Sequence, residues 1–115
     1  HAKAHKCPEL AMLQQKLLGP DLFSGVCCQT IAEAEAMVAG GVTNVLVSNQ
    51  CVPPGKVKRL ADLAKHAEVA VCVDEGGNLK AISEAAVAAD VDIRVLVEAN
   101  VGQNRCGVDT ADQVL

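Results

Sequence analysis

Residues 42–75 read VTNVLVSNQCVPPGKVKRLADLAKHAEVAVCVDE, and this stretch decides the fold. It begins with an apolar run at residues 42–47 and ends with a second one at residues 69–73. Between them, Pro53-Pro54 introduces a segment in which apolar residues recur at helical spacing as far as Lys65. Parallel strands need a long crossover, usually a helix, whereas a short turn joins only antiparallel strands. The stretch therefore predicts a right-handed strand–helix–strand unit.

The same alternation continues on both sides of this unit. Helices are expected over residues 8–18, 30–39 and 78–89, with a last one beginning at Asp109, and strands over residues 24–28 and 93–97. The opening segment looks like the exit from one more strand. The predicted class is α/β with a parallel sheet. A complete (β/α)₈ barrel takes about 250 residues, so the chain fits either about five units of a barrel or an open sheet.

The composition excludes several classes of function. Half of the 115 residues are hydrophobic, yet there is one Phe and no Tyr or Trp, so little is available to stack on bases. The net charge of −4 provides no basic surface for a nucleic acid. No apolar run approaches the ~18 residues of a membrane span. The six cysteines include no C-x-x-C pair, which favours a reduced, cytoplasmic protein over a disulfide scaffold.

Polar residues follow each predicted strand at the point where it ends. Because the carboxyl ends of parallel strands carry the functional groups of α/β folds, we expect these residues to share one edge of the sheet. The set comprises Lys3, His5, Gln29, Thr30, Ser48, Asn49, Gln50, Asp74, Glu75 and residues 98–105.

Lys3 is the first candidate for chemistry at this edge. A lysine becomes a nucleophile or a Schiff-base partner when desolvation or nearby positive charge lowers its pKa, and Lys6 and two histidines are close in sequence. The alternative is a solvated basic tail. A metal pair formed by His5 and Cys7 has too few ligands, because no second His/Cys cluster follows.

Arg105 is the second candidate, in a loop bounded by Gly102 and Gly107. The loop follows the last strand, so it is not the glycine fingerprint of a dinucleotide-binding fold, which lies after the first strand. A guanidinium is permanently charged and suits an oxyanion such as a phenolate or a carboxylate. The alternative is a surface arginine in a turn.

Four blocks of sequence carry a resemblance to a known family. They are HAKAHK at residues 1–6, GVCCQTIAEAE at 25–35, NVLVSNQ at 44–50 and VGQNRCGV at 101–108. In this order they resemble the D-threonine aldolases, a family that includes D-3-hydroxyaspartate aldolases and is similar to the eukaryotic-type D-serine dehydratases. The resemblance implies a pyridoxal-phosphate enzyme of the alanine racemase fold type, and thus a partial (β/α)₈ TIM barrel. Residues 1–115 would be part of its cofactor-binding N-terminal barrel domain, without the C-terminal β domain.

The resemblance also implies an activity, which belongs to the full-length parent protein. It is a lyase reaction, the retro-aldol cleavage of D-threonine or a related D-β-hydroxy-α-amino acid to glycine and an aldehyde. Lys3 would form the Schiff base with pyridoxal 5′-phosphate and Arg105 would face its phenolate oxygen. His5 would assist catalysis, and Gln29 and Asn49 would contact the cofactor. A divalent metal of the Mn, Zn or Mg type would have its ligands outside this chain, and the parent would be a homodimer.

Asn100 is a departure from the family pattern, which usually has Asp there, and it bears on the geometry of the loop around Arg105. Alternatives to the aldolase are a D-serine dehydratase, which shares this half of the site, and a non-catalytic pyridoxal-phosphate-binding protein on the same barrel. The plainest alternative is an α/β domain in which Lys3 is only a tail.

Overall fold

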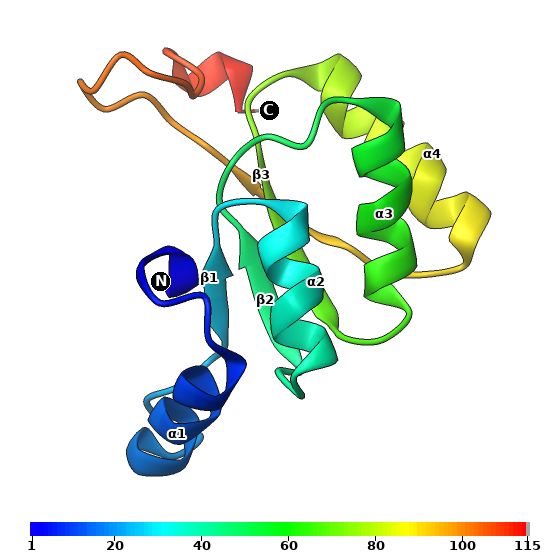
Figure 1. Cartoon of the computed structure of the whole chain (residues 1–115). Coiled ribbons are helices and arrows are strands. Elements are labelled where there is room, and N and C mark those ends of the chain that lie inside the picture. The colour runs from blue at the N-terminus through cyan, green and yellow to red at the C-terminus, as the bar shows by residue number, and fades with distance from the viewer. Residues whose placement is uncertain (115) are drawn as a thin grey trace.

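The computed structural model describes residues 1–114, and in it helices and strands alternate from α1 to β4 (Figure 1). The elements are η1 (Ala2–Ala4), α1 (Pro8–Leu18), β1 (Val26–Cys28), α2 (Ile31–Ala39), β2 (Asn44–Val47), α3 (Pro54–Ala64), β3 (Glu68–Val73), α4 (Gly76–Ala89), β4 (Arg94–Val97) and η2 (Ala111–Gln113), where η marks a 3₁₀ helix. The expected order of strands and helices is confirmed.

The four strands form one parallel sheet in the order β1-β2-β3-β4. The register pairs Val26 with Val45, Val45 with Val69, and Val71 with Val95. Each strand thus lies beside its neighbour in sequence, and the order never reverses. A doubly wound open sheet changes direction at a switch point, whereas a (β/α)₈ barrel adds strands in sequence. The topology is that of a barrel wall.

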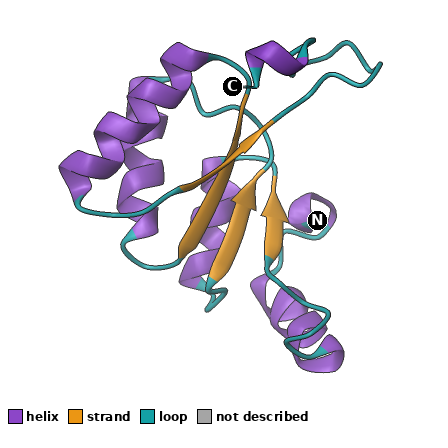
Figure 2. Cartoon of the chain, turned by 180° about the vertical axis from the view of Figure 1, so that it is seen from behind, coloured by secondary structure: helices purple, strands orange, loops and turns teal. Residues whose placement is uncertain are grey.

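Only one face of this sheet is covered. The core joins strand residues of a single parity, such as Val45, Val47 and Val71, to Met37 of α2, Leu60 of α3 and Ile82 of α4. Figure 2 shows the strands from the opposite side. Residues of the other parity, which would face the interior of a closed barrel, line an open hollow that includes Cys27, Leu46, Ala70 and Leu96. Helices on one face only again indicate a barrel wall.

Polar side chains cross the amino end of the sheet on this second face. The Asn44 amide donates to the Glu68 carboxylate at 3.1 Å, and the Arg94 guanidinium donates to Asn44 at 3.1 Å and to Glu68 at 3.2 Å. The three residues come from three neighbouring strands. We call them the amino-edge cluster, and they link β2, β3 and β4 through side chains.

Two helix starts differ from expectation. The helix expected at residue 78 begins at Gly76, because the Glu75 carboxylate accepts from the N–H groups of Gly77 and Asn78 and caps it. The helix expected at Asp109 is a single 3₁₀ turn capped by Thr110.

The start of α2 is fixed by two side chains. Thr30 accepts from the N–H of Glu33, and the Glu33 carboxylate accepts from the N–H of Gln29 at 2.8 Å. The reciprocal bond of the capping box thus lies one residue earlier than in the usual motif.

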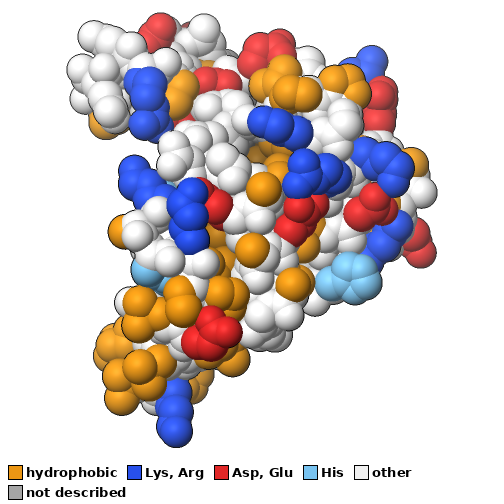
Figure 3. All heavy atoms as spheres, in the orientation of Figure 1, with side chains coloured by type: hydrophobic (Ala, Val, Ile, Leu, Met, Phe, Trp, Pro, Cys, Tyr) orange, Lys and Arg blue, Asp and Glu red, His pale blue; other side chains and the backbone are white. Residues whose placement is uncertain are grey.

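Helix α1 has the expected bounds but is largely uncovered. Only Ala11 of α1 is buried, while hydrophobic side chains gather over the helix at the lower left of Figure 3. The uncovered residues are Leu10, Met12, Leu13, Leu17 and Leu18. The helix packs on α2, where the absence of a side chain at Gly40 leaves room for the Pro8 ring.

All six cysteines are free, as the sequence predicts. Burial raises the pKa of the Cys28 thiol to about 11, so this cysteine behaves as a small hydrophobic residue of the core. No helix within residues 1–114 has the length and hydropathy needed to cross a membrane.

Candidate functional site

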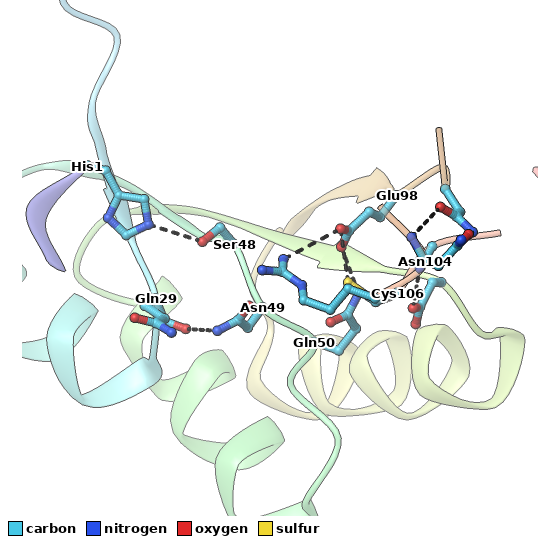
Figure 4. Close-up of polar contacts among 12 residues, drawn as sticks. His1, Gln29, Ser48, Asn49, Gln50, Glu98, Asn104 and Cys106 are labelled. Carbon is cyan, nitrogen blue, oxygen red and sulfur yellow. Dashed lines mark hydrogen bonds and ion pairs between the residues drawn. The ribbon is translucent and has the colours of Figure 1, made fainter. Parts of the chain in front are cut away.

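The carboxyl ends of the strands carry polar residues that the sequence singled out, and Figure 4 shows the contacts of several of them, including Gln29, Ser48, Asn49, Gln50 and Glu98. The loop after β2 lies at the centre. Its Ser48 approaches His1 from the amino-terminal segment, and its Gln50 contacts Glu98 at the end of β4. Segments from the two ends of the chain therefore meet on this loop.

Lys3 is placed at this edge by the residues around it. Ala2 is fully buried and η1 packs against β1. The Nδ1 atom of His1 accepts from the Lys3 N–H at 3.1 Å, and its Nε2 lies 3.5 Å from the Ser48 hydroxyl. Ser48 in turn donates to the carbonyl of Cys28, the last residue of β1, at 3.1 Å. The segment is thus docked on the sheet, while the Lys3 side chain is exposed and forms no ion pair within residues 1–114.

His5 and Lys6 serve the local structure around Lys3. The Nδ1 atom of His5 accepts from the N–H of Cys7 at 3.1 Å, just before α1. Lys6 pairs with Glu33 at 3.0 Å, so its charge is compensated rather than free to act on Lys3. The Gln29 N–H, with smaller contributions from Lys6 and Thr30, lowers the pKa of Glu33. No group of three or more His, Cys, Asp or Glu side chains in residues 1–114 is suited to hold a metal.

The loop that carries Arg105 folds back on the sheet. The N–H of Gly107 donates to the Asp74 carboxylate at 2.9 Å, and the N–H of Val108 donates to the Glu98 carbonyl at 2.8 Å. Gly107 has φ +104°, and a Cβ atom there would lie 2.6 Å from the backbone nitrogen of Asn100. Glycine is therefore required at this position, and the two preceding residues, Arg105 and Cys106, lie against Glu98 at the end of β4.

Asn100 organises the other half of this loop. Its Oδ1 accepts from the N–H groups of Gly102 and Asn104, at 3.1 and 3.0 Å. Its Nδ2 donates to the Asn104 side chain at 2.9 Å and to the Asp109 carboxylate at 2.8 Å. A carboxylate could accept the first two bonds but could not donate the last two. Asn100 therefore supports the loop through hydrogen bonds that an aspartate could not all make, and as a neutral side chain it is no charge partner of Arg105.

Glu98 belongs to the polar set that the sequence predicts at this edge, but its partners there could not be predicted from the local sequence. Its Oε2 accepts from the Gln50 amide at 2.8 Å, and its Oε1 accepts from the Cys106 thiol at 3.1 Å. The same Oε1 lies 4.0 Å from a terminal nitrogen of Arg105. The contact with Cys106, and then the charge of Glu98, raise the pKa of Arg105. Glu98 and Gln50 are 48 residues apart, so no local pattern could pair them.

Gln29 and Asn49 tie the ends of β1 and β2 together. The Asn49 amide donates to the Gln29 carbonyl at 3.1 Å, and the Gln29 N–H is bound by Glu33. These bonds use the backbone of Gln29 and leave its exposed side chain available.

Comparisons with known proteins identify the family to which this chain is related. The family described as alanine racemase, N-terminal domain, matches residues 1–115. The chain is 49% identical over 115 residues to a D-threonine aldolase of Arthrobacter sp. and 42% identical over 116 residues to a 3-hydroxy-D-aspartate aldolase of Paracoccus denitrificans. Each alignment covers all of this chain and 29% of the relative.

A solved structure shares the fold as well. The D-threonine aldolase from Filomicrobium marinum superposes with a TM-score of 0.91 at 50% identity, over 98% of this chain and 30% of that one. The chain thus spans about three tenths of the length of the relatives it matches. The match confirms the expected partial barrel and the expected resemblance, and the chain belongs to the alanine racemase N-terminal domain family.

Proposed function

We propose that these residues form one part of the active site of a pyridoxal-phosphate-dependent lyase that cleaves D-threonine or a related D-β-hydroxy-α-amino acid to glycine and an aldehyde. Enzymes of this aldolase family depend on pyridoxal phosphate in general. The observation that supports the proposal is the pair of contacts made by the loop after β2. Ser48 approaches the segment that holds Lys3, and Gln50 binds Glu98, the neighbour of Arg105.

The donor groups at this edge suit the cofactor. Lys3 offers an exposed primary amine to an aldehyde. Arg105 is 60% exposed and its pair with Glu98 is long, at 4.0 Å, so the guanidinium keeps N–H groups for a phenolate oxygen. When bound, the cofactor accepts the electron pair released by cleavage of the Cα–Cβ bond. The amine of Lys3 would attach the cofactor aldehyde with loss of water and yield that position to the amine of the substrate.

The phosphate group needs partners elsewhere. Helix amino termini are the usual sites for phosphate in such folds, but side chains already cap two of them here. Thr30 and Glu33 cap α2 and Glu75 caps α4, while α1 and α3 begin at Pro8 and Pro54, which provide no N–H donor at their own positions. We therefore propose that residues outside this chain bind the phosphate. The same applies to the ligands of the expected divalent metal.

The remaining residues have supporting roles in this proposal. His5, whose Nδ1 accepts from the N–H of Cys7, lies two residues from Lys3 in the sequence, and its other ring nitrogen would carry a proton for the reaction. Gln29 and Asn49 would contact the cofactor from the ends of β1 and β2, where Asn49 already bridges the two loops.

Attachment of the cofactor at Lys3 tests the proposal. The full-length protein is incubated with pyridoxal phosphate, the adduct is reduced with borohydride, and the modified lysine is located by peptide mass spectrometry. We expect the label on Lys3 and its loss in Lys3→Ala. Lys6→Ala is the matched control, because Lys6 lies three residues away and is paired with Glu33. A label that persists in Lys3→Ala contradicts the proposal.

The products of the reaction test the activity itself. D-threonine should yield glycine and acetaldehyde in equal amounts. Formation of ammonia and a 2-oxo acid from D-serine or D-threonine would instead show a dehydratase, and cofactor attachment without turnover of either substrate would show a non-catalytic binding protein.

A further inference from the structure

The Glu98 carboxylate lies among three side chains from two other segments. Gln50 donates to Oε2 at 2.8 Å, Cys106 donates to Oε1 at 3.1 Å, and Arg105 lies 4.0 Å from Oε1 (Figure 4). The side chain of Glu98 is 25% exposed, against 60% for Arg105. The carboxylate is therefore the sheltered member of this pair and the guanidinium the open one.

The backbone of Glu98 is fixed on both sides. Its N–H donates to the Val73 carbonyl at 2.8 Å, and its carbonyl accepts from the N–H of Val108 at 2.8 Å. With Gln50 holding the carboxylate as well, the orientation of this side chain is set by β2, β3 and β4 together. Arg105, by contrast, is on a loop and has a long and more exposed side chain. The carboxylate of Glu98 is therefore the better-fixed group of the pair.

We propose that Glu98, held by Gln50, is a positioning residue that directs the Arg105 guanidinium toward the phenolate oxygen of pyridoxal phosphate. The inference rests on the function proposed above. At a distance of 4.0 Å the Glu98 carboxylate attracts the guanidinium but does not form a close bidentate pair with it. The guanidinium therefore retains N–H donors for a second oxyanion.

Asp74 has a different role at the same edge. Its carboxylate binds the backbone N–H of Gly107, so it fixes the course of the loop rather than the direction of the guanidinium. Cys106 lies on the loop and adds a second donor to Oε1. Among the residues described, Glu98 is the only carboxylate paired with Arg105.

The affinity of the protein for pyridoxal phosphate tests whether Glu98 positions Arg105. In the full-length protein, Glu98→Gln retains the size of the side chain and an acceptor for Gln50 but removes the charge that aligns Arg105. We expect pyridoxal phosphate to bind about tenfold more weakly, the scale on which outer partners of a binding residue act. Glu68→Gln is the matched control, because it removes a carboxylate paired with Arg94 at the opposite end of the same sheet. It should leave the affinity unchanged.

A double-mutant cycle distinguishes positioning from general loss of structure. If Glu98 acts through Arg105, Glu98→Gln should weaken cofactor binding in the parent but add nothing in an Arg105→Ala background. Equal effects in the two backgrounds would overturn the inference. Gln50→Ala, which releases the carboxylate without removing it, should give a smaller loss that also disappears in the Arg105→Ala background, and it replaces Glu98→Gln if that variant fails to fold.

The same samples separate failure of this inference from failure of the proposed function. If borohydride places no label on Lys3 of the parent, the proposed function is wrong. If Lys3 is labelled but Glu98→Gln binds the cofactor as tightly as Glu68→Gln, only the role of Glu98 is refuted.

Discussion

The side-chain amide of Asn100 donates to the carboxylate of Asp109 across the neck of the loop that carries Arg105, at 2.8 Å. An aspartate at position 100 would set a second negative charge against Asp109. We expect Asn100→Asp in the full-length protein to lower the free energy of unfolding by roughly 1–3 kcal/mol, the value of the two hydrogen bonds that Nδ2 of Asn100 donates. Urea unfolding measures this loss. The double variant Asn100→Asp with Asp109→Asn should recover most of it, and no recovery would contradict the pairing.

Gly107 leads to the next prediction, because its φ of +104° and its contact with the backbone at Asn100 leave no room for a methyl group. Gly107→Ala should cost about 1–3 kcal/mol of stability, as strained backbone positions do. It should also weaken cofactor binding, since the loop presents Arg105. Gly55→Ala is the control: it lies in α3 with nothing within 4 Å of the added methyl, and should be neutral or stabilising by up to about 1 kcal/mol.

The core between α3 and the sheet provides a third prediction. Leu60 is 0% exposed, whereas Leu17 of α1 is 75% exposed. Leu60→Ala should lower the free energy of unfolding by about 2–5 kcal/mol, because it leaves a cavity against the strands. The same change at Leu17 should cost less than about 0.5 kcal/mol if nothing covers α1 in the full-length protein. A large loss at Leu17 would show that another segment packs there.

Asp62 provides a prediction about pH. Hydrogen bonds from Lys58 and then Lys65 lower the pKa of its carboxyl from 3.8 to about 2. A depressed pKa in the folded state stabilises the fold above pH 3.8, and the contribution is lost as the pH falls toward about 2. Carboxyl NMR titration should find this pKa. Replacing Lys58 with Ala should raise the pKa of Asp62 toward 3.8, and an unchanged value would contradict the assignment.

Local signals were sufficient for most of the framework. Pro8 at the start of a leucine-spaced run and Gly19 after it defined α1 to the residue, because caps and periodicity act within one helix. The sequence pattern predicts the start of α4 two residues too late, because that start depends on the Glu75 carboxylate accepting from the N–H groups of Gly77 and Asn78.

The sequence predicts the location of the candidate site but not all of its side-chain contacts. Strand ends converge by topology, so the edge shared by the Lys3 and Arg105 segments followed from the alternation of elements. The bond between Gln50 and Glu98 did not, because it joins side chains 48 residues apart whose meeting depends on the twist and register of three strands.

The amino-edge cluster bears on how the sheet responds to changes in its loops. Asn44, Glu68 and Arg94 fasten three adjacent strands at the edge opposite Lys3 and Arg105. The alignment of the strands is thereby anchored independently of the loops that carry the candidate chemistry. A change in a loop at the other edge, such as the one from Glu98 to Val108, should consequently leave the register of the sheet beneath it intact.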